Sequence, residues 1–390
     1  MELVELGTLL EMEKGKKPAV VSLEPKEGFL PYVDIDVFEK GIIKQYTEGS
    51  KCTPCEDGDI LIVCDGSRSG LVGKAVKGYV GSTLARISAP GLSRDYLYHF
   101  VQGKYALLNT RKKGTGTPHL NPALLKKQKL VVPNVTEQER IVARIEDLFS
   151  QLDAGVETLK KTKALLAVYR QAVLKEAFDS ALEDCKMLPI AEILTKTGKG
   201  MSTGPFGTMI KKSDHKAYGV PMLGIENIGR GQFVDGNKIF VTAEKAEELK
   251  AFSLKAGDII ISRSGTVGEI CAVPERAEGS LLSTNLMRVS LDNAIIRSDY
   301  FIALFQSKGI VLDQIKELCK GSTRDFLNQT ILKQIIFPVP SVERQAEIVS
   351  IIEARMSVCD SIELTVDTAL QQAEAMRQSI LKNAFEGSLA

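Results

Sequence analysis

Two long stretches of the chain, residues 136–181 and 343–389, place apolar residues at steps of three and four and contain no proline. In the first stretch these positions are 141, 145, 148, 152, 159, 166 and 173, and in the second they are Ile348, Ile352, Cys359, Ile362, Val366, Ala373, Met376 and Ile380. This spacing predicts the seam of a coiled coil. A helix of about 45 residues would be roughly 67 Å long, which is more than one small domain can bury.

The start of the first predicted helix carries a capping signal. Thr136 is followed three residues later by Glu139, and Pro133 lies just outside. A hydroxyl residue and a glutamate at this spacing predict a capping box, with Thr136 as the N-cap residue.

The stretches that precede the helices, residues 1–133 and 188–340, are rich in Gly, Pro and short β-branched runs. We refer to them as the first and the second globe. The runs Leu61–Val63, Leu130–Val132 and Asp258–Ile261 predict strands, whereas Tyr96–Leu108 and Tyr300–Leu318 predict helices. Each globe is therefore expected to be a mixed α/β domain.

The two halves of the chain repeat each other. Ser-Arg-Ser-Gly-Leu-Val-Gly at 67–73 returns as Ser-Arg-Ser-Gly-Thr-Val-Gly at 262–268, each time after a Gly-Asp-Ile step. From Pro133 onward a constant offset of 207 residues relates the halves without a gap. The matched pairs include Pro133 with Pro340, Gln138 with Gln345, Asp153 with Asp360, Arg170 with Arg377, and Phe178 with Phe385. The chain is a tandem duplication.

The duplication predicts four consecutive parts, at 1–133, 134–187, 188–340 and 341–390. Two helices in one chain can bury their seams against each other. Antiparallel pairing would relate the globes by a pseudo-two-fold axis, whereas parallel pairing would need a longer return path than Met187–Thr195 offers. We therefore expect an antiparallel pair.

Charge is divided between these parts although the net charge is only +1. The first globe holds 19 Lys and Arg against 15 Asp and Glu, and the second holds 19 against 16. The two helical parts are acidic, with 8 against 10 and 4 against 8. Only the globes are thus candidates for binding a polyanion, although any single basic cluster can equally be solvated surface.

The whole composition is that of a soluble protein able to bury a core, with 390 residues of which 44% are apolar and 25% charged. No stretch approaches the roughly 18 apolar residues of a membrane span, and Met1–Leu10 lacks the basic region of a signal peptide. Seven scattered cysteines do not suggest a disulfide framework. We expect a cytoplasmic protein without membrane attachment.

Several sequence elements resemble the specificity subunits of Type I restriction-modification enzymes, and together they span the whole chain. Each globe ends in a proline followed by a Gln and an Ile-Val pair, at Pro133–Val142 and Pro340–Val349. Also typical are the Gly-Asp-Ile and Ser-x-Ser-Gly-x-Val-Gly elements and the Leu-Lys-x-Ala-Phe helix ends at 174–178 and 381–385. The second copy departs from the pattern in carrying Arg344 before Gln345.

The resemblance implies a definite function. Each globe would be a target recognition domain for one half of a split, asymmetric double-stranded DNA site, and the helices would space the globes and bind two methyltransferase (M) subunits. Restriction and translocation (R) subunits would complete the enzyme. The chain itself would catalyse nothing and would need no cofactor or metal.

Base reading requires polar and basic side chains on projecting loops. The glycine-rich, basic and hydroxylated segment 196–208 is the leading candidate, with residues 14–17 as its counterpart in the first globe; a plain surface loop is the alternative. The Ser-Arg-Ser-Gly elements are the same in both halves, so they cannot distinguish two half-sites and would hold phosphate or simply form a turn. The candidate DNA-binding residues are Lys14, Lys16, Lys17, Arg68, Lys112, Thr115, Lys199, Ser202, Thr203, Lys211, Lys212, Arg263 and Arg324.

Two other classes compete with this interpretation. The first is an enzyme, either a methyltransferase or a nuclease. A methyltransferase would need an Asn/Asp-Pro-Pro-aromatic tetrad, and Asn121-Pro122-Ala123 does not provide one, while no nuclease carboxylate cluster stands out. A coiled-coil interaction protein without DNA binding would explain the helices but not the two basic globes. Cys52 and Cys55 form a single Cys-x-x-Cys without a second pair, so a zinc or redox role is not expected.

Overall fold

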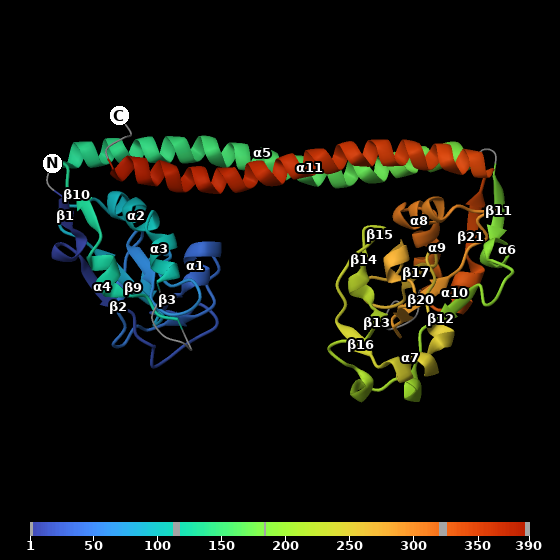
Figure 1. Cartoon of the computed structure of the whole chain (residues 1–390). Helices are drawn as coiled ribbons and strands as arrows, with labels where there is room; N and C mark the ends of the chain where they lie inside the picture. The colour runs from blue at the N-terminus through green and yellow to red at the C-terminus, as the bar shows by residue number, and fades with distance from the viewer. Residues whose placement is uncertain (1–2, 112–117, 183–184, 320–325, 387–390) are drawn as a thin grey trace. The chain divides into compact units, whose positions relative to one another are not determined.

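The computed structural model describes residues 3–111, 118–182, 185–319 and 326–386, and it divides into two compact units. Unit 1 comprises Met1–Lys160 and Asp367–Ala390, and unit 2 comprises Lys161–Val366. Each unit therefore contains one globe together with part of each of two long helices, α5 and α11 (Figure 1). None of the helices that the structure describes is both long and apolar enough to cross a membrane.

Unit 1 combines small sheets with short helices, as the mixed α/β prediction requires. Its strands are β1 (Leu3–Glu5), β2 (Glu11–Lys14), β3 (Leu30–Val33), β4 (Tyr46–Thr47), β5 (Pro54–Cys55), β6 (Ile60–Val63), β7 (Val72–Lys74), β8 (Gly78–Val80), β9 (Leu84–Ser88) and β10 (Lys129–Val131). Its short helices are α1 (Ile35–Lys40), α2 (Arg94–Gln102), α3 (Tyr105–Thr110) and α4 (Pro122–Lys126). The helix predicted over Tyr96–Leu108 is thus two helices, interrupted at Gly103.

Unit 2 has the same composition of elements. Its strands are β11 (Lys186–Pro189), β12 (Met201–Thr203), β13 (Val220–Leu223), β14 (Ile228–Gly229), β15 (Gln232–Phe233), β16 (Ile239–Val241), β17 (Ile259–Ser262), β18 (Ile270–Ala272), β19 (Leu281–Leu282), β20 (Leu286–Val289) and β21 (Ile336–Val339). Its short helices are α6 (Ile190–Ile193), α7 (Ala243–Glu248), α8 (Ser298–Gln306), α9 (Val311–Cys319) and α10 (Gln329–Gln334). The stretch predicted as one helix over Tyr300–Leu318 is again two.

Both globes are built on the same strand order. The first contains the sheet β2-β9-β6-β7 and the second the sheet β12-β20-β17-β18. Each globe also contains one parallel strand pair outside this sheet. In the first globe β3 pairs with β8, and in the second globe β13 pairs with β19. The predicted strands at Leu61–Val63 and Asp258–Ile261 are confirmed as the fully buried strands β6 and β17. The duplication read from the sequence is therefore a duplication of fold.

The long helices are α5 (Val135–Leu182, 48 residues) and α11 (Val342–Phe385, 44 residues). In unit 1 Arg377 pairs with Asp153, and in unit 2 Arg170 Nη2 lies 2.7 Å from Asp360 Oδ1. In both units the numbers fall along one helix as they rise along the other, so the packing is antiparallel as expected. The two ion pairs use the same two repeat positions with the helices exchanged.

Along the middle of α11 the buried positions follow a seven-residue period. Ile352, Cys359, Val366 and Ala373, seven residues apart, are buried. Ile362 is 40% exposed and Met376 is 55% exposed, so their assignment to the seam was wrong. Apolar residues at steps of three and four predict two seam positions in each heptad, and in this part of α11 only one of the two is buried.

The start of α5 also differs from the prediction. The helix begins at Val135, and the side chain of Asn134 accepts a hydrogen bond of 2.9 Å from the backbone N–H of Glu137. In the second repeat Ser341 does the same for Arg344 at 3.2 Å. The cap is therefore two residues earlier than Thr136, at a position filled by a good N-cap residue in both repeats.

A buried glutamine joins the first globe to α5. Gln138 is fully buried, and its Oε1 accepts a 2.7 Å hydrogen bond from the backbone N–H of Ser93, at the start of α2. Its Nε2 donates to the carbonyls of Gly91 at 2.8 Å and Pro133 at 2.9 Å. One side chain thus satisfies three backbone groups, of which the Pro133 carbonyl is buried.

The second globe carries the same clamp. Gln345, also fully buried, accepts from the backbone N–H of Arg297 at 2.8 Å and donates to the carbonyls of Ile295 and Pro340, both at 2.9 Å. The repeated proline-to-glutamine spacing is explained by this contact. It fixes the direction in which a helix leaves its globe.

The far end of each long helix packs on the globe of the other repeat. In unit 1 the ring of Phe385, at the end of α11, lies 5.0 Å from the ring of Tyr96 and 5.2 Å from that of Phe100. In unit 2 the ring of Phe178, in α5, lies 5.6 Å from that of Tyr300. All three contacts are edge-to-face, the arrangement that aromatic pairs favour. Each globe is thus completed by a helix end that belongs to the other repeat.

Candidate nucleic-acid interface

The candidate loops of the two globes leave the same place in the fold. Gly15 follows β2 and Gly204 follows β12, and their backbone N–H groups donate to the carbonyls of Leu84 at 2.9 Å and Leu286 at 3.2 Å. A Cβ on either glycine would collide with the backbone of the turn that leads into β9 or β20. Only glycine allows the chain to approach this closely. Residues 14–17 and the segment 196–208 are therefore structural counterparts.

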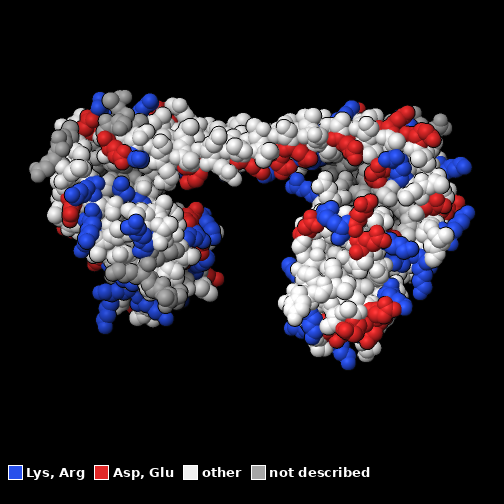
Figure 2. Space-filling model, in the orientation of Figure 1, with Lys and Arg blue, Asp and Glu red and all other residues white. Residues whose placement is uncertain are grey.

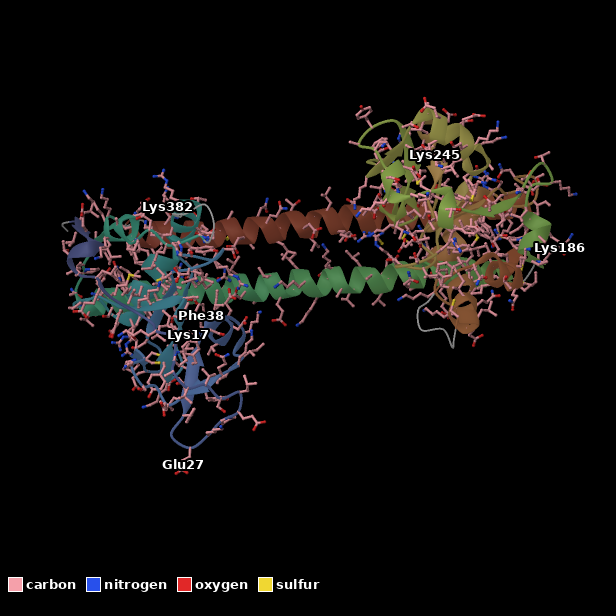
Figure 3. The ribbon with its side chains drawn as sticks, turned by 90° about the horizontal axis from the view of Figure 1, so that it is seen from below. Lys17, Glu27, Phe38, Lys186, Lys245 and Lys382 are labelled. Carbon is pink, nitrogen blue, oxygen red and sulfur yellow. The ribbon has the colours of Figure 1, made fainter. Side chains whose placement is uncertain are left out.

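In the first globe the loop carries exposed cations. Lys14 Nζ lies 2.9 Å from Asp65 Oδ2, and the other carboxylate oxygen of Asp65 lies 2.7 Å from His119 Nδ1. The hydrogen bond to Asp65 raises the pKa of Lys14. Lys16 and Lys17 are exposed, and Figure 3 shows Lys17 on this globe. Lys14 is thus held in place by a carboxylate, whereas Lys16 and Lys17 project into solvent.

In the second globe the counterpart is polar and less basic. Lys199 is exposed, and its backbone carbonyl accepts from Arg288 Nη2 at 3.4 Å. Ser202 and Thr203 lie in β12, where Ser202 is opposite Arg288. The Ser202 hydroxyl is buried and has no hydrogen-bond partner among the described residues. The strand thus tethers Ser202 and Thr203, while Lys199 is available to a ligand.

Lys211 and Lys212 follow the same loop at its far side. The backbone N–H of Lys211 donates to Asp214 Oδ2 at 2.8 Å and so closes a short 3-10 turn. Both lysine side chains are exposed. A fixed turn with two projecting ammonium groups suits contact with a phosphate backbone.

The arginine of the first Ser-Arg-Ser-Gly element has an intramolecular partner. Arg68 forms an ion pair with Glu39. The neighbouring Ser69 is buried and donates to the carbonyl of Gly66 at 2.7 Å, and Asn109 donates to the carbonyl of Ser69 at 3.0 Å. These contacts account for the element as a turn after β6.

The arginine of the second element is more deeply engaged. Arg263 Nε donates to the carbonyl of Leu327 at 3.1 Å, and its Nη1 donates to the carbonyl of Thr284 at 3.1 Å. Its guanidinium carbon lies 4.6 Å from the centre of the Phe326 ring. Burial lowers the pKa of this guanidinium. The side chain therefore ties three segments of the globe together.

Three candidates, Lys112, Thr115 and Arg324, lie outside the described residues. Of the remaining ten candidates, four lie in the first globe and six in the second. Figure 2 shows Lys and Arg gathered on the end of the first globe that is remote from its helices, whereas over the second globe they are mixed with Asp and Glu. The two globes thus present different electrostatic surfaces on one framework.

The comparison with known families settles what this framework is. Residues 1–164 and 200–372 match the Type I restriction modification DNA specificity domain, so both repeats are covered. The chain belongs to this family. Its relatives include the specificity subunit of the Type I restriction enzyme MjaVIII from Methanocaldococcus jannaschii, 24% identical over all of this chain and 92% of the relative. The specificity subunit of EcoKI from Escherichia coli is 24% identical over 95% of this chain and 82% of its own length.

Solved structures show the same fold. A chain from work on complex assembly and conformational transition of the type I R-M system has a TM-score of 0.74 and 17% identity, and covers all of this chain and 98% of its own. The HsdS subunit of Thermoanaerobacter tengcongensis has a TM-score of 0.56 and 16% identity over 100% and 97% of the two chains. The prediction of a Type I specificity subunit with two globes and long packed helices is confirmed.

Metal and thiol chemistry gains no support in this specificity-subunit fold. Burial raises the pKa of the Cys55 thiol to about 11 and also raises that of Cys52. Over residues 3–111, 118–182, 185–319 and 326–386, no three His, Cys, Asp or Glu side chains gather as metal ligands would. His99 is buried between α2 and α5, and burial lowers its pKa, which fits a neutral core histidine.

Sequence reasoning missed two groups of polar residues beside the loops. In the first globe Asp65 and His119 are 54 positions apart in the sequence yet form a hydrogen bond, and Asp65 also pairs with Lys14. In the second globe Glu226 and Asn285 line the same hollow. Neither group belongs to a motif. The signal that could have found the second is the match of Pro31–Asp36 with Pro221–Glu226, which places a carboxylate at the same point of both globes.

Proposed function

We propose that this chain is the subunit that reads a bipartite, asymmetric double-stranded DNA sequence for a Type I restriction-modification enzyme. Each globe, 1–133 and 188–340, reads one half-site, and the chain directs two M subunits and the R subunits to that site. It catalyses no step itself. The observation that carries the proposal is the pair of counterpart loops, because one framework presents Lys-Gly-Lys-Lys at 14–17 and Thr-Gly-Pro-Phe at 203–206.

The difference between the loops has a physical meaning for recognition. Lysines that project into solvent attract phosphate without regard to sequence, whereas hydroxyl and amide groups read base edges. Two globes with the same side chains would read the same half-site twice. Two globes with different loops on the same framework support an asymmetric site.

Exposed apolar side chains on the long helices are evidence for the proposed binding of M subunits. In unit 2 three apolar side chains of α5 are exposed, Leu165 and Val168 at 66% each and Tyr169 at 50%. An exposed apolar patch of this kind marks a protein interface. The positions 207 residues later are Gln372, Ala375 and Met376, of which Met376 is 55% exposed. The patch therefore differs between the repeats, although the helix packing beneath it is the same.

The deciding experiment is methylation in a living host. The chain is expressed with its M subunit in cells that lack adenine methylation, and N6-methyladenine is mapped across the genome. The expected result is a split motif with two different halves that appears only when the chain is present. Methylation without the chain, or in an unsplit motif, would show that specificity lies elsewhere.

A second measurement separates DNA reading from a purely helical interaction role. Binding of the chain–M complex to a DNA duplex should weaken steeply between about 50 and 200 mM salt, because bound counterions are released. Association of the chain with M through apolar helix contacts should change little over that range. A complex that forms but binds DNA at no salt concentration would favour the coiled-coil interaction role.

A further inference from the structure

The second globe contains a hollow beside the candidate DNA-binding segment 196–208. It has a volume of about 210 Å³ and lies between β13, β16 and the turn that leads into β20. Its walls are apolar, from Ile210, Met222, Ile225 and Ile239, and its polar groups come from His215, Glu226 and the turn residues Ser283, Thr284 and Asn285. In Figure 1, β13 and β16 lie near the end of the second globe that is remote from the helices.

The Glu226 carboxylate forms no ion pair among the residues that the structure describes, although His215 lines the same hollow. The first globe treats the equivalent group differently. Asp36 follows β3 as Glu226 follows β13, and it pairs with Lys40 at 2.8 Å and also with Lys44. The same framework position is neutralised in one globe and left open in the other.

The backbone that presents Glu226 is held firmly. Glu226 lies in a 3-10 turn, Ile225–Asn227, and the fully buried Asn227 accepts from the backbone N–H of Gly224 at 2.9 Å. Asn227 Nδ2 donates to two carbonyls of the following hairpin, both at 3.0 Å. The backbone of the turn is therefore fixed before a ligand binds, which limits the entropy lost on binding.

The turn residues Ser283, Thr284 and Asn285, which also line the hollow, supply further hydrogen-bonding groups. Asn285 is exposed, and its Oδ1 lies 3.2 Å from the Ser264 hydroxyl, so its amide N–H groups remain as donors. The buried hydroxyl of Ser283 has no hydrogen-bond partner among the described residues. Thr284 donates to the carbonyl of Pro205 at 2.6 Å and so holds the Gly-Pro-Phe-Gly segment against this wall.

We propose that this hollow, with Glu226 and Asn285 both in its lining, reads a base of the second half-site that carries an exocyclic amino group; this rests on the proposed function. A carboxylate accepts from cytosine N4 or adenine N6, and it is repelled by the O6 of guanine and the O4 of thymine. Lys211 and Lys212 follow Ile210 at the rim and hold the phosphate backbone. Glu226 is thus a specificity-determining residue, and Asp36 in the first globe is not.

The test compares methylation motifs of the chain–M complex. Glu226→Gln keeps the size of the side chain but adds a donor, so one position of one half-site should accept guanine or thymine, with the discrimination at that position falling about tenfold or more. The other half-site should stay as in the wild type. Glu248→Gln, an exposed carboxylate on α7, is the matched control and should leave both half-sites unchanged.

Each outcome decides the matter. If the motif with Glu226→Gln is unchanged, the inference is wrong while the proposed function stands. If Glu226→Gln abolishes methylation, Asn285→Ala decides, because a motif relaxed in one half-site supports the hollow as a base reader and an unchanged motif overturns it. A wild-type chain that yields no split motif would overturn the proposed function, and this inference with it.

Discussion

The first and the second globe share a framework and differ at its rim. Both have the same strand order, the same buried glutamine clamp and the same close approach of a glycine after β2 or β12. At the rim, Lys16 and Lys17 in one globe stand where Pro205 and Phe206 stand in the other, and a carboxylate is paired in one and open in the other. The comparison teaches that repeated residues of this chain serve packing, and that recognition is to be sought among residues that do not repeat.

The largest expected effect tests whether the two helix-end phenylalanines contribute equally to the stability of their units. Phe178 is fully buried against Tyr300, whereas Phe385 is half-buried against Tyr96. Phe178→Ala should lower the free energy of unfolding by about 4 kcal/mol and Phe385→Ala by less, because loss of a fully buried ring leaves the larger cavity. Urea unfolding followed by circular dichroism measures both. A larger loss from Phe385→Ala would contradict the packing described here.

The glutamine clamps should respond alike. Gln138→Leu or Gln345→Leu removes three hydrogen bonds and leaves the buried carbonyl of Pro133 or Pro340 without this partner, and each change should lower the free energy of unfolding by about 3 kcal/mol. The exposed Gln151, whose side chain donates to Asp147, provides the matched control Gln151→Leu, expected to change stability little. Thermal unfolding monitored by calorimetry compares the three variants. A clear difference between the two clamp variants would break the equivalence of the globes.

The rim lysines should govern how DNA affinity depends on salt. Lys16→Gln with Lys17→Gln should reduce the slope of log affinity against log salt by about 2 if each lysine neutralises one phosphate. Lys211→Gln with Lys212→Gln should do the same from the second globe. Titrations of the chain–M complex by fluorescence anisotropy at several salt concentrations measure the slope, with Lys382→Gln on α11 as the control. Slopes that match the wild type in both double variants would remove these lysines from the interface.

The smallest expected effect is an acid dependence that belongs to the first globe. Hydrogen bonds from Lys40 and Lys44 lower the pKa of Asp36 to about 2. A carboxyl whose folded pKa is depressed contributes stability above its unfolded pKa of about 4 and loses it as the pH falls towards the folded value. The stability difference between wild type and Asp36→Asn should therefore shrink between pH 5 and pH 2, as measured by urea unfolding at each pH. A difference that stays constant would mean that the ion pairs do not form in solution.

Much of the fold was predictable because the chain contains its own alignment. A match of Gln138 with Gln345 and of Phe178 with Phe385 marked positions that turned out to be clamps and ring contacts. Burial of strands β6 and β17 also followed from their apolar runs. In each of these features both contacting residues are repeated in the two halves of the chain. Comparing the halves of one sequence is therefore enough to detect them.

The rest depended on distances that spacing does not encode. Ile362 and Met376 fit the helical pattern but are exposed in the structure. An apolar residue at the right spacing does not by itself show which side of the helix is covered. Arg68 and Arg263 resembled phosphate ligands in sequence, yet one pairs with Glu39 and the other donates to backbone carbonyls. Glu226 belongs to no motif, and the sequence alone does not show that it lacks the ion pairs that Lys40 and Lys44 form with Asp36.

The crossing of the helix ends has a consequence for how the protein is made. The ribosome completes the first globe long before it reaches Phe385, whose ring packs on Tyr96 and Phe100. During that interval Tyr96 and Phe100 lack this cover, because Phe385 has not yet been synthesised. The globe that is synthesised first is therefore the one that finishes folding last, and a nascent chain that stalls within α11 would expose an apolar surface to chaperones and proteases.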